Sequence, residues 1–531
     1  MAPLNLITSV LLPANLPTLS SLAIATLLVA PLAWVIYTRF FHPLAKFPGP
    51  FAASVTRWWY VREVGKGNFD KTHRKLHARY GPIVRIAPNE VTISDASAVQ
   101  TIYGIKSKFT KTDWYDVWRG PNRGTKHFDQ FTDRDEKHHA ARRRLLSNMY
   151  SMTSVLESEP YIDDCSEVLM RKLSALAERG VSIDLGKWLQ MYAFDVIGEL
   201  YFGSAFGFLE AGDDPDGWIE TLDESMPARL DVANMSTMWR RPYDFLKSLR
   251  MAHSDGAKRF ADMAAWVDDR VNERHRLLGA GDLASNVNTS RKDMLAKLFE
   301  LRDTKGEKED FNTADVQQEG WVGTSAGSDT TAIAMRAIVH QLLTHPEALR
   351  RVRAELESAM VNGGLSLPVK FSEAQQNLPF FCACIKEAMR LHPSVGLTMP
   401  RLVPAGGSEV AGQFFPEGTT VGINPAVLHY DPSIFGSDAA EFNPDRWLSP
   451  NASGMDRFLL TFGGGTRTCI GKNISLAEVH KMLPTLFMTF DMELTHERPW
   501  ESHDFWFNKQ TGLDVKLSKR TVMPSPPVFG R

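Results

Sequence analysis

Apolar residues recur along the chain either with the spacing of an α-helix or in short runs typical of strands. The helical spacing dominates and predicts a mainly helical protein with little sheet. From about Lys137 to Leu301, apolar residues recur at every third or fourth position, the spacing of one face of an α-helix. Polar stretches are expected to interrupt these helices at 213–217, 279–288 and 302–312. Short apolar or alternating runs predict strands at 83–93, 403–413, 419–423 and 513–517, the last of them an exposed strand. No repeat or linker divides this pattern, so we expect one large domain.

The N-terminal segment carries no charge. Arg39 is the first charged residue, and the run from Leu19 to Tyr37 approaches the ~20 apolar residues that cross a bilayer as a helix. Basic residues follow this run and none precedes it, which places the short N-terminus in the lumen and the bulk of the chain in the cytosol. We therefore predict a membrane anchor at 1–38, a proline-rich hinge at 39–50 and a single domain at 51–531. A buried core helix is the alternative for the first segment.

Composition excludes several classes of protein. The 60 lysines and arginines nearly balance the 62 aspartates and glutamates, and no long basic run occurs, so no nucleic-acid partner is expected. Four cysteines in 531 residues are too few for a disulfide scaffold, and they form no CxxC pair with the spacing of zinc ligands. The chemistry of this large globular protein must therefore be sought in individual motifs.

The most informative segment is Phe462-Gly-Gly-Gly-Thr-Arg-Thr-Cys-Ile-Gly471. Its three consecutive glycines can take positive φ values and approach a planar ligand closely. Cys469 stands at the start of an amphipathic helix, where backbone N–H groups stabilise a thiolate. Arg467 can pair with a carboxylate of the same ligand. A lone cysteine is more often an inert buried residue, but Phe462, Arg467 and Cys469 in this spacing indicate a ligand-binding loop.

This segment resembles the haem-binding loop of cytochromes P450, FxxGxRxCxG, at every specified position. Further motifs of that family occur upstream in the family's order. Ala326-Gly-Ser-Asp-Thr-Thr331 resembles the oxygen-activating motif of the long central helix, Glu387-Ala-Met-Arg390 the ExxR pair, and Pro444-Asp-Arg446-Trp447 the segment that supplies a second arginine. His139-Ala-Ala-Arg-Arg143 occupies the place of a WxxxR motif, with histidine where tryptophan is usual.

The resemblance covers the whole chain and implies the fold. It predicts a mainly α protein with minor β, the single large haem-thiolate fold of the cytochrome P450 family, preceded by one N-terminal transmembrane helix. Glu387 and Arg390 lie one helical turn apart, and with Arg446 they are expected to form a structural ion-pair cluster that is costly to break from one side.

The resemblance also implies the cofactor and the residues that bind it. Haem b is expected, with Cys469 as the axial ligand of its iron, and thiolate ligation favours cleavage of the O–O bond. Asp329 and Thr330 are the expected catalytic residues: Thr330 hydrogen-bonds dioxygen and Asp329 relays protons from solvent. Ala326 leaves room for dioxygen and shares one helix face with both. The further residues expected to bind the cofactor are Arg467, Arg401, Arg143, His139 and Phe462.

The function implied is a monooxygenase of the microsomal fungal type, which includes pisatin-demethylase-like enzymes. It would insert one oxygen atom from O2 into a hydrophobic small molecule in secondary-metabolite biosynthesis. By resemblance, the substrate pocket is lined by 114–131, 395–399, 506–510 and the helix around Gly323 and Ala326, although aromatic residues there are often plain core.

The partner implied is a separate NADPH–cytochrome P450 reductase, with cytochrome b5 as a further electron donor. It would dock on a basic patch, and the candidates are Lys137, Arg142, Arg144 and Lys472, for which an ordinary solvated face is the alternative. The location implied is the endoplasmic reticulum membrane, with the catalytic domain on the cytosolic face. The alternatives are desaturation, ring closure or oxidative coupling by the same haem enzyme, a reductase-independent isomerase or dehydratase, and a non-enzymatic haem-binding sensor or carrier.

Overall fold

The computed structural model describes residues 29–121, 123–240, 242–243, 255–279 and 291–520. Helices dominate it, as the periodicity predicts. The α-helices of its first half are α2 Phe51–Val55, α3 Trp58–Val64, α4 Phe69–Tyr80, α5 Ala98–Tyr103, α6 Glu136–Leu146, α7 Met152–Leu156, α8 Glu159–Arg179, α9 Leu185–Phe202, α10 Phe208–Ala211, α11 Trp218–Asn234 and α13 Asp255–Gly279. Those of its second half are α14 Met294–Glu309, α15 Thr313–Thr344, α16 Pro346–Val361, α17 Phe371–Asn377, α18 Pro379–Leu391, α19 Pro425–Leu428, α20 Pro432–Phe435, α21 Ala452–Asp456 and α22 Lys472–Thr489. Tighter turns of 3-10 helix are η2 Asp113–Trp118, η3 Ser147–Tyr150, η5 Pro444–Leu448 and η6 Gly465–Arg467, and Tyr37–Phe41 forms a π-helical turn.

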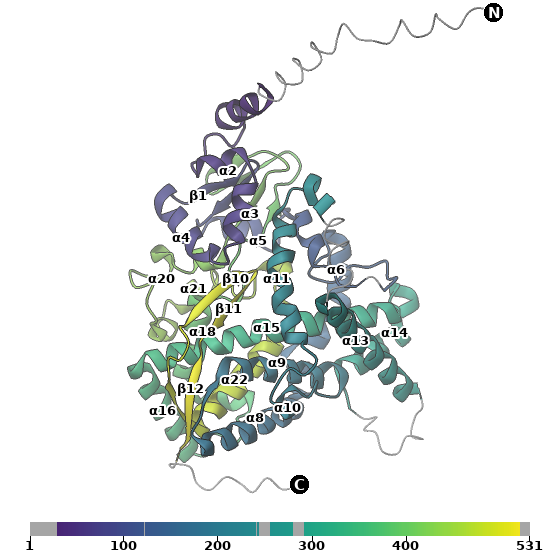
Figure 1. Ribbon diagram of the computed structural model, residues 1–531, viewed down its shortest axis with the longest axis vertical. Coiled ribbons are helices and arrows are strands. Elements are labelled where there is room, and N and C mark those ends of the chain that lie inside the picture. The colour runs from purple at the N-terminus through teal and green to yellow at the C-terminus, as the bar shows by residue number, and fades with distance from the viewer. Residues whose placement is uncertain (1–28, 122, 241, 244–254, 280–290, 521–531) are drawn as a thin grey trace, which may run out of the picture.

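The strands form four small sheets. They are β1 Ile83–Ala87, β2 Glu90–Ile93, β3 Thr110–Lys111, β4 Ser182–Asp184, β5 Arg401–Leu402, β6 Ser408–Val410, β7 Gln413–Phe415, β8 Thr420–Gly422, β9 Phe490–Leu494, β10 Glu501–Phe505, β11 Phe507–Thr511 and β12 Asp514–Lys519. The largest sheet has the order β1-β2-β8-β5-β3 and packs with α2 and α4 at one end of the molecule (Figure 1). Its last pair of strands sets Lys111 opposite Arg401.

The long helix α15 runs through the centre of the molecule, with α9, α18 and α22 packed around it (Figure 1). Its start is fixed by a capping box in which Asn312 and Asp315 bond each other's backbone N–H groups. Two glycines let α9 approach closely. A Cβ at Gly323 would lie 2.3 Å from the Tyr201 ring, and a Cβ at Gly327 would lie 2.6 Å from Ile197. The spacing of small residues on α15 therefore sets its distance from α9.

Two sequence predictions about local structure need correction. The break predicted at 302–312 is confirmed only for its last residues, 310–312: α14 continues to Glu309, and the chain leaves the helix at Asp310, whose φ is 48°, before α15 begins at Thr313. Its lysines and glutamates are good helix formers that need only an exposed face. The strand at 513–517 is not exposed: β12 is the centre of the sheet β4-β12-β9, and it buries Val515 and Leu517. The polar linker at 213–217 and the strands at 83–93 are confirmed. The linker at 279–288 lies almost wholly outside the described residues.

Of the predicted membrane anchor and hinge, the structure describes only the part from residue 29 onward. Most of the expected anchor at 1–38 lies outside the described residues, and from residue 29 onward, in the described ranges, no helix is both long and apolar enough to cross a membrane. The following segment, 39–50, packs against the domain. Leu44 and Phe47 are buried, the Phe47 ring stacks on Phe415 at 5.0 Å, and the Pro48 carbonyl accepts a 2.8 Å hydrogen bond from the N–H of Arg85.

A buried ionic cluster holds α18 to the chain that precedes the cysteine loop. Glu387 accepts hydrogen bonds from Arg390 at 2.7 and 2.8 Å, from Arg446 at 2.9 Å and from the Trp447 indole at 2.9 Å. The side chains of Glu387 and Arg390 have 0% exposure. Both carboxylate oxygens of Glu387 accept hydrogen bonds from these donors. This geometry agrees with the structural role predicted for Glu387, Arg390 and Arg446.

His429 extends this cluster to the cysteine loop. Its Nε2 accepts the N–H of Leu460 at 2.8 Å, which leaves Nδ1 to donate to the carbonyl of Arg390 at 2.9 Å. Burial lowers the pKa of His429 to about 3, so the ring stays neutral and keeps this tautomer. The loop that carries Cys469 begins two residues after Leu460 and is therefore tied to α18 through one imidazole.

Replacing Glu387 by leucine is expected to lower the free energy of unfolding by about 3–5 kcal/mol, because two buried guanidinium groups lose their counter-charge. Urea denaturation followed by circular dichroism measures this. The matched control is Glu347→Leu, since Glu347 and Arg350 form the same i,i+3 pair at 2.6 Å but with 71% and 68% of their side chains exposed. The control should leave the urea midpoint unchanged. Equal effects of the two substitutions would contradict the role assigned to Glu387.

Candidate active site

The cysteine loop has a backbone that only glycine permits at two positions. Gly463 and Gly465 have φ values of 71° and 58°. A Cβ at Gly465 would lie 1.9 Å from the carbonyl oxygen of Tyr103, so this position also needs the close approach that glycine allows. The N–H of Cys469 closes the loop by donating to the carbonyl of Phe462 at 2.8 Å. Phe462 and Cys469 thus define the two ends of one rigid turn.

Cys469 differs from the other cysteines in its surroundings. Its side chain is exposed, whereas Cys165 and Cys384 are buried. Although its surface is accessible, the protein surrounding the Cys469 thiol displaces most of its solvent and raises its pKa, while the backbone N–H groups of Gly471 and Lys472 and the charge of Arg143 act in the opposite direction. These N–H groups belong to the start of α22, as the sequence predicts, and they favour a thiolate there.

The face of α15 that carries Ala326 is open. Ala326 is exposed and Thr330 partly so, although α15 crosses the centre of the molecule and its residues from 331 to 339 are all buried. The Thr330 hydroxyl donates to the carbonyl of Ala326 at 2.9 Å, and the Thr330 carbonyl accepts from Ser394 at 2.8 Å. A hydroxyl has one proton and two lone pairs, so Thr330 can accept a further hydrogen bond without releasing Ala326.

Asp329 points away from this open face, so the prediction that it shares one face with Ala326 and Thr330 is wrong: its carboxylate turns to α9. It is buried and accepts a hydrogen bond from the side-chain amide of Gln190 on α9, whose carbonyl oxygen in turn accepts from Arg336 at 2.8 Å. Burial raises the pKa of Asp329 to about 6, and Lys509 and Arg336 oppose that shift. The carboxyl can therefore change its protonation near neutral pH, as a proton relay requires. In the described residues, no hydrogen bond joins it to Thr330.

A cluster of buried cations lies beside the cysteine loop. Arg401 donates to the Tyr115 hydroxyl at 2.6 Å, Arg143 donates to the carbonyl of Thr468 at 2.7 Å, and Arg467 binds Glu136 at 2.7 Å. The structure thus brings the three arginines, predicted from separate motifs, to one region. His139 belongs to it as well, because the charges of Arg467 and Arg143 both act on its ring.

The sequence missed a fifth member, Lys111. It is buried in β3 opposite Arg401, donates to the carbonyl of Phe131 and lies 4.4 Å from the centre of the Tyr115 ring. Burial lowers the pKa of Lys111 well below its usual range, and the charges of Arg401 and Arg467 add to the effect. No local sequence signal marks this lysine, because its pairing with Arg401 joins positions almost three hundred residues apart.

In the described residues, Glu136 is the one acid that forms an ion pair with the cation cluster, and two polar atoms of the cluster lack partners. Nη1 of Arg467 and Nδ1 of His139 are buried and have no hydrogen-bond partner among the described residues. Burial and the neighbouring cations lower the pKa of His139 to about 3, so its ring is neutral and its free nitrogen can donate or accept. Unpaired buried donors are costly, so this site fits a ligand with carboxylates. The propionates of haem meet that requirement, next to a cysteine loop that admits a planar group.

Comparison with known proteins decides the family. The family model for cytochrome P450 matches residues 48–516. This chain belongs to the cytochrome P450 family. It is 40% identical over 490 residues to the cytochrome P450 monooxygenase gsfF of Penicillium aethiopicum, which covers 92% of this chain and 96% of that protein. It is 36% identical over 492 residues to a pisatin demethylase of Fusarium vanettenii, which covers 91% and 90%. It is 37% identical over 464 residues to a cytochrome P450 monooxygenase of Aspergillus terreus, which covers 86% and 91%.

The predicted family, enzyme class and cofactor are confirmed: the chain is a cytochrome P450 monooxygenase that uses haem with a cysteine thiolate ligand. Bound haem supplies the activation of dioxygen. We expect the protein's part to be holding this group, with Cys469 for the iron and with Arg401, Arg467, His139 and Lys111 for the carboxylates. We expect Ala326 and Thr330 to face it from α15.

The predicted basic patch needs one correction. Arg142 is not on the surface: it is buried and forms an ion pair with Asp315 at 3.2 Å. Successive residues of a helix point about 100° apart, so α6 turns its three adjacent arginines to different environments. Arg143 reaches the cysteine loop and Arg144 is exposed, as are Lys137 and Lys472.

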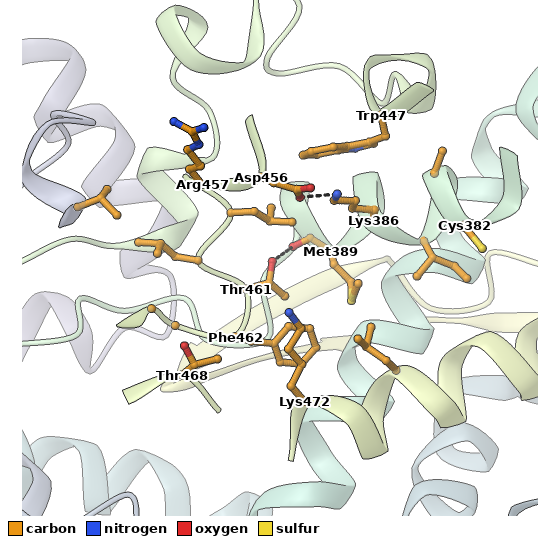
Figure 2. Close-up of a pocket in the computed structure, with 18 of the residues that line it drawn as sticks. Cys382, Lys386, Met389, Trp447, Asp456, Arg457, Thr461, Phe462, Thr468 and Lys472 are labelled. Atoms are coloured by element: carbon orange, nitrogen blue, oxygen red, sulfur yellow. Dashed lines mark hydrogen bonds and ion pairs between the residues drawn. The ribbon is translucent and has the colours of Figure 1, made fainter. Parts of the chain in front are cut away.

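A pocket of about 830 Å³ reaches the cysteine loop from the side of α18 and α21 (Figure 2). Trp447, Met389 and Phe462 give it an apolar lining, and no residue of α15, β3 or β5 borders it. The charged residues that line it are Lys386, Asp456, Arg457 and Lys472, with Lys386 and Asp456 ion-paired. The pocket is therefore separate from the cation cluster and carries a positive excess.

Replacing Arg467 by leucine is expected to weaken haem binding about ten- to a hundredfold, because a buried charged donor to a carboxylate is lost. The rate at which the purified protein loses haem to apomyoglobin measures the change. Arg144→Leu is the control, since this arginine is exposed on α6 and removes the same charge. Unchanged haem loss in Arg467→Leu would show that the cation cluster does not hold the carboxylates.

Proposed function

We propose that this cytochrome P450 inserts one oxygen atom from O2 into a hydrophobic small organic molecule of fungal secondary metabolism, with electrons from NADPH delivered by a separate reductase. The observation that carries the proposal is the placement of two neighbouring residues of α15. Thr330 lies on the open face of the helix, and the carboxyl of Asp329 is buried next to it against α9. Rearrangement of a peroxide needs no such pair, whereas oxygen insertion needs protons delivered one at a time. The relatives named as monooxygenases and as a demethylase support the same reaction class.

Asp329 is the proton donor in this proposal. Its carboxyl lies near the ion pair of Lys509 and Asp223, whose side chains are 21% and 37% exposed and which act on its pKa with opposite signs. A proton can enter from solvent at that pair and reach the open face when the bond from Gln190 is released. Thr330 receives it as an acceptor, since both its lone pairs are free. A pKa near 6 keeps both forms of Asp329 populated around neutral pH.

The electron donor docks over the pocket of about 830 Å³ that reaches the cysteine loop. Lys472 and Arg457 are exposed at this pocket, and the described residues include no acid that forms an ion pair with either. An acidic flavoprotein is attracted to such a surface. A donor bound there stands close to Cys469, which lies three residues before Lys472, and the path for electrons is then short. NADPH–cytochrome P450 reductase is the proposed partner.

The chain attaches to the endoplasmic reticulum membrane through residues 1–38, with its domain on the cytosolic side. Two features support this. The segment up to Thr38 is free of charge, and basic residues follow it. The first described residues expose large apolar side chains, among them Trp34, Phe40 and Phe41, which suit a lipid interface.

Disruption of the gene in the source organism, followed by mass spectrometry of its metabolites, tests the reaction. We expect one product to vanish and a precursor lighter by one oxygen to accumulate. Complementation with Thr330→Ala should restore about a tenth of the product or less, because proton delivery is impaired. Thr344→Ala is the control, since the Thr344 hydroxyl makes the same kind of bond, at 2.8 Å, to the carbonyl four residues back in α15. A precursor differing by two hydrogens, or an isomeric one, would instead indicate desaturation or rearrangement.

The docking surface is tested by reversing its charge. The double substitution Lys472→Glu and Arg457→Glu should raise the reductase concentration needed for half-maximal NADPH oxidation about tenfold at low salt, with a smaller change at high salt. Reduction by dithionite, which needs no docking, should not change. Lys71→Glu with Arg79→Glu makes the same charge change on exposed positions of α4 and is the control. An equal effect of both double variants would point to net charge alone.

A further inference from the structure

A strained residue forms the tip of the hairpin β10–β11. Phe505 pairs with Phe507, so Trp506 alone makes the turn, and its φ is 83°. A bulky side chain at positive φ is unfavourable, and glycine is the usual residue for such a position. Hairpin tips also normally face solvent, but Trp506 is only 5% exposed. Strain that the surroundings enforce in this way points to a function for the side chain.

Trp506 packs into a group of aromatic rings, here called the aromatic cluster: Trp114, Trp118, Phe131 and Trp506. The Trp506 ring lies 4.6 Å from Trp114, 5.9 Å from Phe131 and 6.0 Å from Trp118, and Trp114 and Trp118 are 5.3 Å apart. Three of the four come from the segment 114–131, so the hairpin tip closes a surface that this segment begins. The strained turn is what brings the fourth ring into place.

The two neighbouring indoles of this cluster differ in their hydrogen bonds. Trp114 donates its N–H to Asn234 at 3.1 Å. The N–H of Trp118 is buried and has no partner among the described residues. A buried donor without an acceptor is costly, and tryptophan is placed in a core only where its N–H can be satisfied. The acceptor that Trp118 requires is therefore best supplied by a ligand.

The aromatic cluster adjoins the reaction site on two sides. The Trp506 carbonyl accepts from Gly396 at 3.4 Å, and two residues earlier Ser394 donates to the carbonyl of Thr330 at 2.8 Å. On the other side, the Phe131 ring lies 4.7 Å from the Lys111 ammonium of the cation cluster. The cluster thus stands between the open face of α15 and the residues that hold the haem carboxylates.

We propose that the aromatic cluster selects the substrate, a flat aromatic molecule with a hydrogen-bond acceptor such as a carbonyl oxygen, and that Trp118 donates to this acceptor. Trp118 and Phe131, which are partly exposed, supply ring surface for stacking, and the buried Trp506 holds these rings in place. The unpaired N–H of Trp118 fixes how the molecule lies against α15. The inference rests on the proposed function and narrows its substrate class. Rings that served only as core would need neither a strained hairpin tip nor an unpaired donor.

Equilibrium binding of two matched probes to the haem-loaded protein tests the proposal. Fluorenone and fluorene share one planar aromatic frame and differ in a carbonyl against a CH2 group. Quenching of tryptophan fluorescence and the shift of the haem absorption band give the dissociation constants. The wild-type protein should bind fluorenone about tenfold more tightly than fluorene, because only the ketone can accept from Trp118.

Two variants test the hydrogen-bond donor of Trp118 and the ring surface of the aromatic cluster separately. Trp118→Phe keeps a ring and should abolish the preference for fluorenone while leaving fluorene within about twofold. Trp506→Gly relieves the positive φ and should weaken both probes about tenfold. Trp58→Phe is the control, since Trp58 is exposed on α3. Equal affinities in the wild type, a preference that survives in Trp118→Phe, or no binding at all would overturn the proposal. Binding needs neither NADPH nor oxygen, so a failure of the monooxygenase function would appear separately, as an absence of NADPH-dependent product.

Discussion

Buried positive charge is the constraint on which this site depends. Lys111, Arg401 and Arg467 are brought together by a sheet pairing and a loop, and Glu136 forms an ion pair with Arg467 alone. Burial and then the charges of Arg401 and Arg467 lower the pKa of Lys111, so its charged form is costly at this place. We expect the two carboxylates of bound haem to remove this cost, which would couple cofactor binding to folding of the region.

The central helix α15 meets two demands with small residues. Gly323 and Gly327 face α9 and let it approach closely, while Ala326 between them lies on the open face. A larger side chain at either glycine would push α9 away, and with it Gln190, the residue that holds Asp329. Packing and proton delivery are therefore linked through one helix pair. The ionic cluster around Glu387 fixes the cysteine loop on the other side, so the distance between α15 and Cys469 is set by two rigid parts.

Much of this could be predicted from the sequence wherever the determinants are local. Residues Phe462 to Cys469 form a turn whose glycines and cysteine are contiguous, and Glu387 and Arg390 lie one turn apart on a helix. Lys111 could not be found, because its importance arises from a pairing with Arg401 across the sheet. The burial of β12 likewise depends on β4 and β9, which are distant in sequence. Local motifs thus specify the ligand to the iron, whereas the charge around it is a property of the tertiary structure.

The three arginines of α6 show that adjacent residues of one type can differ completely in their tertiary surroundings. Arg142, Arg143 and Arg144 are identical in type and adjacent, and the sequence distinguishes Arg143 only through the register of a motif, which leaves Arg142 and Arg144 alike. Helix geometry sends the first to Asp315 at the start of α15, the second to the carbonyl beside Cys469 and the third to solvent. One helix turn therefore joins the capping box of α15 to the cysteine loop. A shift of α6 by one residue would exchange all three environments, so the register of this helix is fixed by both of its buried arginines together.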